Sequence, residues 1–281
     1  ENLNVLDEHM FYCKPTHDSL PSPEACAVTG ITPQLCEKKG LIEHEFIKKI
    51  HAEFSKSETC IVGYNSIAFD DEYTRHTLFR NFIDPYSWHW QNGNARWDIL
   101  NVARFCYAHK EKGSLNWVIN EKNRPIFKLD NLAPANNIEH ANAHDAMADV
   151  RATIGIAKII KDTQPKFFDY ALSLNDKKEV GRLVKPLHPM LLTSSSFGYK
   201  SSFTRLVTAI CNHPKYNDRA IVFNLNQDPE IFLELEVEEL KTLTFSKKSD
   251  LPKGIEKLDL SELVYNKSPM FVCSPNSDNF K

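Results

Sequence analysis

The chain has 281 residues, a formal net charge of −3, 42% hydrophobic residues and 11% aromatic residues, which excludes a disordered or fibrous protein. This length fits two domains more naturally than one, and no apolar run approaches the ~18 residues that a membrane-spanning helix needs. The charge excludes a globally basic nucleic-acid binder, although a local basic surface remains compatible with it.

Seven cysteines are scattered along the chain without a CxxC pair. This spacing is typical of reduced thiols in the cytosol and not of a disulfide framework or a zinc site. The first residues also lack the basic region of a signal peptide. We therefore expect a cytoplasmic protein that has no contact with a membrane.

Strand-like and helix-like segments alternate through the first half of the chain. In chain order they are a strand remnant at 11–13, a helical pattern that Gly40 ends, a helix at 43–54, a buried strand at 59–65, a helix from Asp70 to about Phe82, helices at 97–108 and 129–137, and a long helix at 148–160. This alternation predicts an α/β fold with a mixed or parallel sheet.

The pattern changes after Gln164-Pro165. Residues 166–174 and 177–184 predict helices that connect to a second region, in which short apolar runs alternate with turn signals. These runs are PMLLTSS, RLVTAICNH, RAIVFNLN, ELVYNK and PMFVCSP. We predict a second, mainly β domain of small-barrel size and place the boundary near Asp162, which gives domains 1–162 and 163–281.

Charge is distributed unevenly in this second half. Four acidic residues accompany a basic set between positions 161 and 205, which consists of Lys161, Lys166, Lys177, Lys178, Arg182, Lys185, Lys200 and Arg205. The segment 228–239 is acidic by contrast. A polyanion-binding groove and an ordinary solvated helix surface both explain this asymmetry. If it is a groove, neutralising Lys177, Lys178 and Arg182 weakens binding more at low salt than at high salt.

The stretch HANAHDAMADV, residues 140–150, places polar side chains at the start of an alanine-rich helix. Helical residues are rotated by about 100° each, so His144 and Asp149 reach one site only if His144 lies on the preceding loop. A carboxylate that is turned half toward a core requires a cation or a hydrogen-bond donor. We expect Asp149 to lie beside the apolar face, which runs through Ala146, Val150, Thr153 and Ala157.

Asp70, in NSIAFDDEYTR, also stands where a helix begins. Taken singly, an N-cap is the ordinary role of Asp70, and a helix-end hydrogen bond is an ordinary role of His144. Taken together with Asp149, two carboxylates and a histidine at helix starts indicate a metal-assisted hydrolase acting on phosphates. The carboxylates would hold divalent cations, and the histidine would take a proton from water near neutral pH.

The spacing H-x4-D at His144 and Asp149, with N-x4-D at Asn65 and Asp70, resembles the DEDDh branch of the 3′–5′ exonucleases. Longer stretches resemble bacterial exonuclease I, a single-strand-specific deoxyribonuclease family, over nearly the whole chain. These stretches are FYCKP, TGITP, GYNSIAFDDEYTRHTLFRNF, NARWDILNVARFCYA, EHANAHDAMADVRATI and QPKFFDY.

This resemblance implies a ribonuclease-H-like 3′–5′ exonuclease domain followed by a β-rich SH3-like domain. The implied activity is hydrolysis of single-stranded DNA from its 3′ end to 5′-mononucleotides, in DNA repair and recombination. The implied cofactor is a pair of Mg²⁺ ions, with Mn²⁺ able to substitute. The implied partners are single-stranded DNA and a single-stranded-DNA-binding protein, and the chain itself is expected to be a monomer.

The family's motifs also imply roles for single residues. Asp70 and Asp149 match two of four metal-binding carboxylates, and His144 matches the general base that activates water. Substrate contacts are implied for Lys128, Arg75, Tyr86, Trp90 and Arg104. The run DPYSWHWQNGN alternates aromatic and polar residues, which suits stacked bases, although packing is the ordinary role of Tyr86, Trp88 and Trp90. Trp97 is expected in the core.

The family's first motif, Asp-x-Glu, is absent from this chain. Asp7-Glu8 has the wrong spacing, and Asp70-Asp71-Glu72 already belongs to the second motif. We interpret the chain as a fragment that lacks the first strand and the C-terminal domain, and we expect it to bind metal poorly and cleave little by itself. Two alternatives stay open: an exonuclease of the same branch that acts on RNA ends, and an inert single-strand-binding module.

Overall fold

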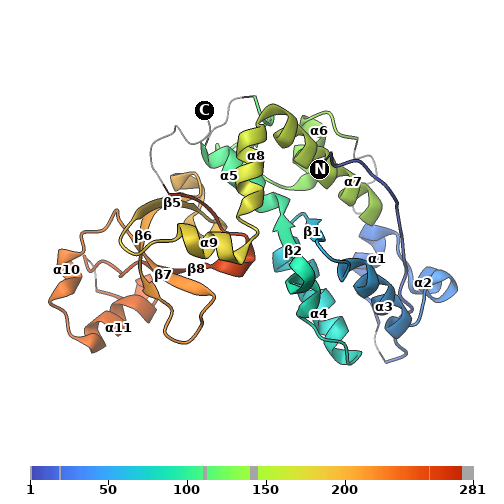
Figure 1. The fold of residues 1–281 in the computed structure, drawn as a ribbon, viewed down its shortest axis with the longest axis horizontal. Helices are drawn as coiled ribbons and strands as arrows, with labels where there is room; N and C mark the ends of the chain where they lie inside the picture. The colour runs from blue at the N-terminus through green and yellow to red at the C-terminus, as the bar shows by residue number, and fades with distance from the viewer. Residues whose placement is uncertain (1, 19, 110–112, 140–144, 253, 274–281) are drawn as a thin grey trace. The chain divides into compact units, whose positions relative to one another are not determined.

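A computed structural model describes residues 2–18, 20–109, 113–139, 145–252 and 254–273 (Figure 1). The chain divides into two compact units. Unit 1 contains Glu1–Ala103 and Glu111–Asp169, and unit 2 contains Arg104–Lys110 and Tyr170–Lys281. Within the described residues, no helix combines the length and apolar character that crossing a membrane requires. All seven cysteines lie in the described part, and none of them forms a disulfide.

Unit 1 consists mainly of helices around a short parallel strand pair. Strands β1 (Cys60–Gly63) and β2 (Ala95–Asp98) are paired in parallel, with Cys60 opposite Ala95. Strands β3 (Val118–Ile119) and β4 (Pro125–Ile126) form an antiparallel pair. The helices are α1 (Pro23–Thr29), α2 (Pro33–Lys39), α3 (Glu43–Phe54), α4 (Asp70–Arg80), α6 (Leu129–Ala135) and α7 (Ala146–Thr163). Helices α5 (Ile99–His109) and α8 (Pro165–Ser173) contribute residues to both units.

The predicted helices of this half are confirmed, but one strand assignment and the start of one helix were wrong. Residues 11–13 do not form a strand and make only an isolated bridge between Cys13 and Leu41. Trp97 and Asp98 end β2 instead of beginning α5, because Trp97 is held in register opposite Val62. Trp97 is nevertheless buried, as predicted, and its ring packs edge-on against Phe168 at 5.1 Å between centroids.

The buried face of α7 differs from the predicted one. Val150 is exposed, whereas the buried side chains of the helix are Ala152, Thr153, Ile156, Ala157 and Ile160. Asp149 stands one turn before Thr153, and side chains four residues apart share a face of an α-helix. Asp149 therefore lies on the buried face itself, whereas the sequence analysis predicted that it lies beside that face.

Unit 2 is built on a five-stranded antiparallel sheet with the order β8-β7-β6-β5-β9. The strands are β5 (Pro189–Thr193), β6 (Thr204–Asn212), β7 (Arg219–Asn224), β8 (Leu260–Val264) and β9 (Met270–Val272), which confirms all five predicted runs. Helix α9 (Lys177–Leu183) precedes the sheet, as predicted. Buried side chains of the sheet include Met190, Val207, Val222 and Phe271.

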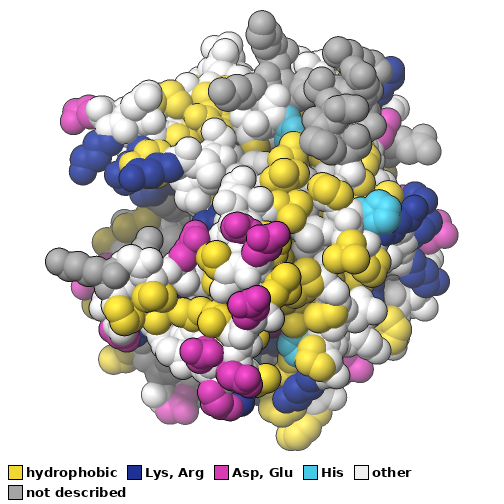
Figure 2. Space-filling view, turned by 90° about the vertical axis from the view of Figure 1, so that its left-hand side faces the viewer, with side chains coloured by type: hydrophobic (Ala, Val, Ile, Leu, Met, Phe, Trp, Pro, Cys, Tyr) yellow, Lys and Arg dark blue, Asp and Glu magenta, His cyan; other side chains and the backbone are white. Residues whose placement is uncertain are grey.

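Two helices in the acidic segment of unit 2 were not predicted. They are α10 (Glu230–Leu233) and α11 (Val237–Phe245). Helix α11 begins with a capping box, in which Glu236 and Glu239 satisfy each other's backbone N–H groups. Acidic side chains lie among exposed apolar ones on the face turned to the viewer in Figure 2. Unit 2 is therefore mainly β, with two short helices added between β7 and β8.

Candidate active site

The first candidate carboxylate, Asp70, lies at the start of α4. The N-cap position belongs to Phe69, which makes no side-chain capping hydrogen bond, so Asp70 is the first helical residue and not the cap. A short 3₁₀ turn at Ser66–Ala68 leads directly into the helix, after Asn65 in a left-handed conformation with φ 63°. The loop after β1 therefore determines where the carboxylate of Asp70 lies.

Asp98 anchors this loop from the neighbouring strand. Its buried carboxylate accepts three backbone N–H groups: Asn65 N at 2.8 Å, Ile67 N at 3.3 Å and Leu100 N at 3.0 Å. One side chain at the end of β2 thus fixes the turn before α4 and the first turn of α5. Asp98 was not singled out from the sequence, where its only signal is an aspartate between a buried tryptophan and a helix.

A buried ion pair holds the first turn of α4 against β2. Arg96 Nη1 donates to Asp71 Oδ2 at 2.7 Å, and the side chains are 14% and 7% exposed. Burial raises the pKa of Asp71, Arg96 opposes this effect, and the nearby carboxylates of Asp98 and Asp70 add to it. This pair also escaped the sequence analysis, because 25 residues separate its partners.

Asp149 brings a second carboxylate toward Asp70 from α7. It lies in the first turn of that helix, and its Oδ1 atom is buried. Partial burial raises the pKa of Asp70 above its ordinary value, a backbone hydrogen bond lowers it, and the negative charge of Asp149 raises it further. The two carboxylates therefore interact, as the shared site predicted for them requires.

Two negative charges that approach each other in a partly desolvated place favour a cation between them. The described residues contain no group of three histidine, cysteine, aspartate or glutamate side chains suited to a metal ion. Asp70 and Asp149 thus form a pair of candidate ligands within this part of the chain. His144, the predicted general base, lies outside the described residues.

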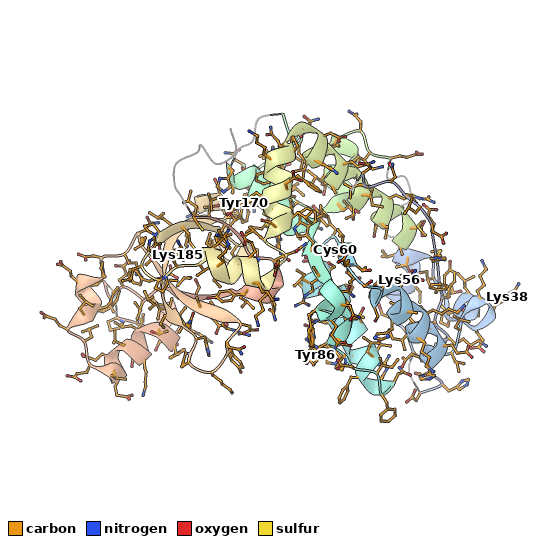
Figure 3. All side chains as sticks on the ribbon, viewed as in Figure 1. Lys38, Lys56, Cys60, Tyr86, Tyr170 and Lys185 are labelled. Carbon is orange, nitrogen blue, oxygen red and sulfur yellow. The ribbon has the colours of Figure 1, made fainter. Side chains whose placement is uncertain are left out.

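Three residues predicted to contact the DNA strand lie near each other on unit 1: Arg75, Tyr86 and Trp90. Arg75 pairs with Glu72, and its guanidinium carbon lies 5.7 Å from the centroid of the Tyr86 ring. Tyr86 and Trp90 are 52% and 60% exposed, and the label in Figure 3 shows Tyr86 beside α4. Trp88, between them, is 2% exposed and packs on Phe54. The alternating run therefore supplies two exposed rings and one core ring.

The remaining two predicted contacts have different settings. Lys128 is exposed at the N-cap of α6, and the hydroxyl of Tyr64 donates to the carbonyl of the preceding residue, Phe127. Because Tyr64 directly precedes Asn65, this bond ties the Lys128 segment to the loop before Asp70. Arg104 is half-buried on the part of α5 that belongs to unit 2.

An exposed aromatic pair beside Asp70 was missed from the sequence. The rings of Phe69 and Tyr73 lie 4.8 Å apart at an angle of 55°, and both side chains are more than half exposed. Tyr73 stands three residues after Asp70 and shares its side of α4. The detectable signal was this spacing, which places an aromatic ring next to a candidate metal ligand.

Comparison with known proteins shows the family to which the chain belongs. A family model described as "Exonuclease" matches residues 1–157, which is more than half of the chain. The chain belongs to the exonuclease family. A second model, "Exonuclease I SH3-like domain", matches residues 175–277 of this exonuclease-family chain. The two matches confirm the predicted order of domains, whereas the boundary near Asp162 stays a prediction.

Curated relatives of this exonuclease-family chain carry the name Exodeoxyribonuclease I. The relative from Haemophilus influenzae is 45% identical over 275 residues, which cover 96% of this chain and 58% of the relative. The relative from Escherichia coli is 44% identical over 252 residues, which cover 89% and 53%. The chain thus spans little more than half the length of the relatives it matches.

Solved structures agree with this family and confirm the predicted fold class. Escherichia coli exonuclease I with a dA16 oligonucleotide superposes with a TM-score of 0.91 at 40% identity, covering 100% of this chain and 59% of that one. Its zinc-bound complex with single-stranded DNA gives 0.89 at 40% identity, with 100% and 59% covered. A complex of exonuclease I with SSB-Ct gives 0.88 at 39% identity, with 98% and 60% covered.

Proposed function

We propose that this chain carries the site of a 3′–5′ exodeoxyribonuclease that hydrolyses single-stranded DNA to 5′-mononucleotides. The observation that carries the proposal is the approach of two carboxylates, Asp70 and Asp149, from two helices of an exonuclease-family chain. The similarity to Escherichia coli exonuclease I, whose structure contains an oligonucleotide, supports DNA as the substrate.

The donor set at this site fits a divalent cation. Carboxylate oxygens are the ligands that Mg²⁺ and Mn²⁺ prefer, and the mutual repulsion of Asp70 and Asp149 falls when a cation binds. We infer two Mg²⁺ ions as the resident cofactor, with Mn²⁺ able to substitute, and the zinc-bound relative supports a divalent ion. When bound, such ions polarise the phosphoryl oxygens and activate water.

The chain's own residues would divide the remaining tasks. Asp70 and Asp149 hold the metal, and His144 takes a proton from the attacking water. Asp98 keeps the loop before α4 in place through its three backbone hydrogen bonds. The ion pair of Arg96 and Asp71 fixes the turn that bears Asp70.

Exposed rings around the site suit a single strand of any sequence. Phe69, Tyr73, Tyr86 and Trp90 all present more than half of their side-chain surface to solvent. Stacking on aromatic rings is tolerant of sequence because every base has a flat face. Lys128, Arg75 and Arg104 would meet phosphates of the strand. This combination fits an enzyme that removes any nucleotide in turn.

We infer the cellular context from the same similarity. The SSB-Ct complex of exonuclease I supports a single-stranded-DNA-binding protein as partner. A role in DNA repair and recombination, a cytoplasmic location and a monomeric chain complete the proposal.

Matched DNA and RNA oligonucleotides test the substrate on the chain joined to the family's Asp-x-Glu strand, because the chain by itself is expected to cleave little. They differ only in the 2′-hydroxyl and the thymine methyl group, and an enzyme for DNA shortens the DNA strand from its 3′ end while leaving RNA intact. Faster cleavage of RNA would assign the chain to an RNA-processing exonuclease. Binding of the strand that is the same with EDTA and with Mg²⁺, without any cleavage, would favour the inert binding module.

A further inference from the structure

Residues 127–138, which contain α6 and are called the α6 brace below, contact both of the segments that bear the candidate ligands (Figure 1). At the start of the brace, Phe127 is bound by Tyr64, which directly precedes the loop that leads to Asp70. At its end, Ile138 lies against α7, the helix that bears Asp149. The brace therefore connects the two carboxylates through a path that lies entirely within unit 1.

The contact at the start of the brace depends on one hydroxyl group. Tyr64 donates this hydroxyl to the backbone carbonyl of Phe127. The ring of Phe127 also packs edge-on against Trp117, with 5.9 Å between the centroids. Because Tyr64 bonds to the backbone, the bond fixes the main chain of the brace and not only a side chain. Replacing the hydroxyl alone would release this end.

The contact at the end of the brace depends on a glycine. A Cβ atom on Gly155 would lie 3.0 Å from Cδ1, 3.1 Å from Cγ2 and 3.2 Å from Cγ1 of Ile138, which is closer than ordinary van der Waals contact. Glycine is unfavourable inside a helix, and Gly155 stands in the interior of the 18-residue helix α7. Its φ is not positive, so the backbone conformation does not require glycine. The close approach of Ile138 explains the glycine instead.

The middle of the brace is held in place by burial and hydrogen bonds. Leu132 and Ala133 are fully buried. The side-chain amide of Asn136 donates to the carbonyls of Leu132 at 2.8 Å and Asn116 at 3.0 Å, and its oxygen accepts the N–H of Asn116 at 2.7 Å. The N–H of Ile138 donates to the carbonyl of Ala133 at 3.0 Å. A segment fixed in this way transmits a displacement of one end to the other.

We propose that the α6 brace sets the separation of Asp70 and Asp149, with Tyr64 and Gly155 as its positioning residues. Moving either end of the brace shifts one carboxylate relative to the other. Mg²⁺ accepts little deviation from its preferred ligand geometry, so a changed separation weakens its binding between the two carboxylates. The inference deepens the proposed function and rests on it for the choice of metal.

Titration of the chain with Mn²⁺ up to millimolar concentration tests the start of the brace without any need for cleavage. An ion shared by the two carboxylates broadens the backbone amide NMR signals of Asp70 and Asp149 over the same concentration range. We expect Tyr64→Phe, which removes only the hydroxyl, to raise the concentration for half-maximal broadening about tenfold. Tyr12→Phe is the matched control, because the hydroxyl of Tyr12 donates to Met10 Sδ at 3.6 Å and not to the brace.

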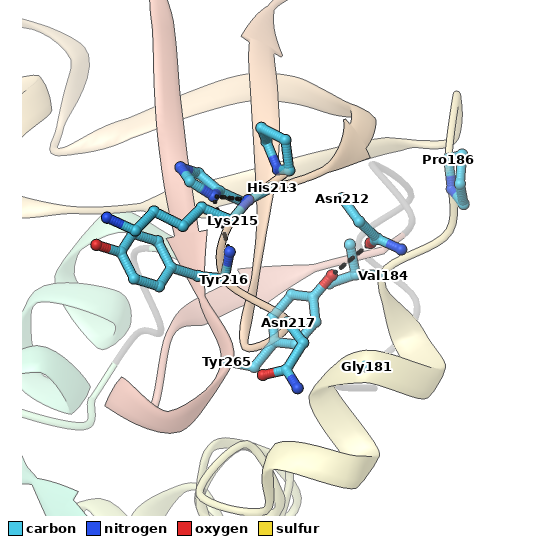
Figure 4. Close-up of a pocket in the computed structure, with 10 residues that line it drawn as sticks. Gly181, Val184, Pro186, Asn212, His213, Lys215, Tyr216, Asn217 and Tyr265 are labelled. Atoms are coloured by element: carbon cyan, nitrogen blue, oxygen red, sulfur yellow. Dashed lines mark hydrogen bonds between the residues drawn. The ribbon is translucent and has the colours of Figure 1, made fainter.

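A size exchange tests the end of the brace in the same titration. Gly155→Leu forces α7 away from Ile138 and is expected to raise the Mn²⁺ concentration by about tenfold. Ile138→Ala in the same chain removes the three atoms that the new side chain meets, so the double variant should recover the unchanged response. Gly181→Leu is the matched control in α9 of unit 2, where the leucine would meet Tyr265 beside a pocket (Figure 4).

The outcomes separate the brace from the proposed function. The proposal is overturned if Tyr64→Phe leaves the Mn²⁺ response unchanged, if Ile138→Ala does not restore the response of Gly155→Leu, or if Gly181→Leu alters it equally. Should Gly155→Leu fail to fold, Tyr64→Phe decides alone. Asp149→Asn tests the proposed function itself: a response at Asp70 that survives this change, or no response in the unchanged chain, would count against a shared carboxylate site.

Discussion

Two adjacent acidic residues of α4 illustrate how burial determines how much stability is lost when an ion pair is broken. Asp71 and its partner Arg96 are 7% and 14% exposed, whereas Glu72 and Arg75 are 42% and 32% exposed. Removing one member of a buried pair leaves an uncompensated charge. We expect Asp71→Ala to lower the free energy of unfolding by about 3 kcal/mol, measured by urea denaturation.

The neighbouring substitution is the matched control for this measurement. Glu72→Ala breaks a pair that water already screens, so the expected loss is under about 1 kcal/mol. Equal effects of Asp71→Ala and Glu72→Ala would show that the pair with Arg96 does not hold the turn that bears Asp70.

His109, at the end of α5, gives the fold a dependence on pH. Burial lowers its pKa from 6.5 to about 4. Since the unfolded chain binds this proton more readily, the contribution of His109 is complete above about pH 6.5 and declines as the pH falls toward 4. The free energy of unfolding of the unchanged chain is expected to fall between pH 7 and pH 5. In His109→Gln this fall should be smaller by up to about 2 kcal/mol.

Urea denaturation at the two pH values measures this effect. His76→Gln is the control, because the side chain of His76 is 70% exposed on α4. A pH dependence that stays the same in His109→Gln as in the unchanged chain would contradict the role assigned to burial.

At the scale of elements, the carboxylate of Asp98 connects β2 to the loop before α4. Replacing it by alanine removes both oxygens that accept the N–H groups of Asn65, Ile67 and Leu100. We expect Asp98→Ala to cost about 1–3 kcal/mol in stability. Hydrogen exchange at these three amides is expected to become faster.

Asp84 offers a matched control for the exchange measurement. Its carboxylate accepts the backbone N–H groups of Tyr86 and Ser87 on the surface. Asp84→Ala should therefore affect exchange at those two amides and leave the loop before α4 unchanged. Unchanged exchange at Asn65 and Ile67 in Asp98→Ala would refute the anchoring role.

The elements with a clear period could be predicted from the sequence, and the short ones could not. Residues 43–54 and the run after Ala146 repeat apolar side chains at helical spacing, and both are helices. The four residues of β2 are too few to show a period, and their strand depends on pairing with β1. Helices α10 and α11 were missed because exposed apolar residues, Leu233, Val237 and Phe245, obscure the helical spacing of Leu240 and Leu243, which pack against the core.

At the scale of the whole chain, the family and the order of its domains could be predicted from motif-length resemblance. Asp70 and Asp149 were identified in the same way, as a pair expected to share a site. The residues that position the segment bearing Asp70, Asp98 and Arg96, were not. Their roles arise from contacts between segments that are distant in the sequence, and the amino-acid sequence alone does not reveal such contacts.

Cleavage of a 5′-labelled single strand in Mg²⁺ tests the central claim most directly. The assay compares three proteins: the chain itself, the chain joined to the family's Asp-x-Glu strand, and that longer protein with Asp149→Asn. We predict shortening from the 3′ end by the longer protein, little cleavage by the chain itself, and a loss of at least about a hundredfold with Asp149→Asn. Undiminished cleavage by the Asp149→Asn protein would contradict the carboxylate site.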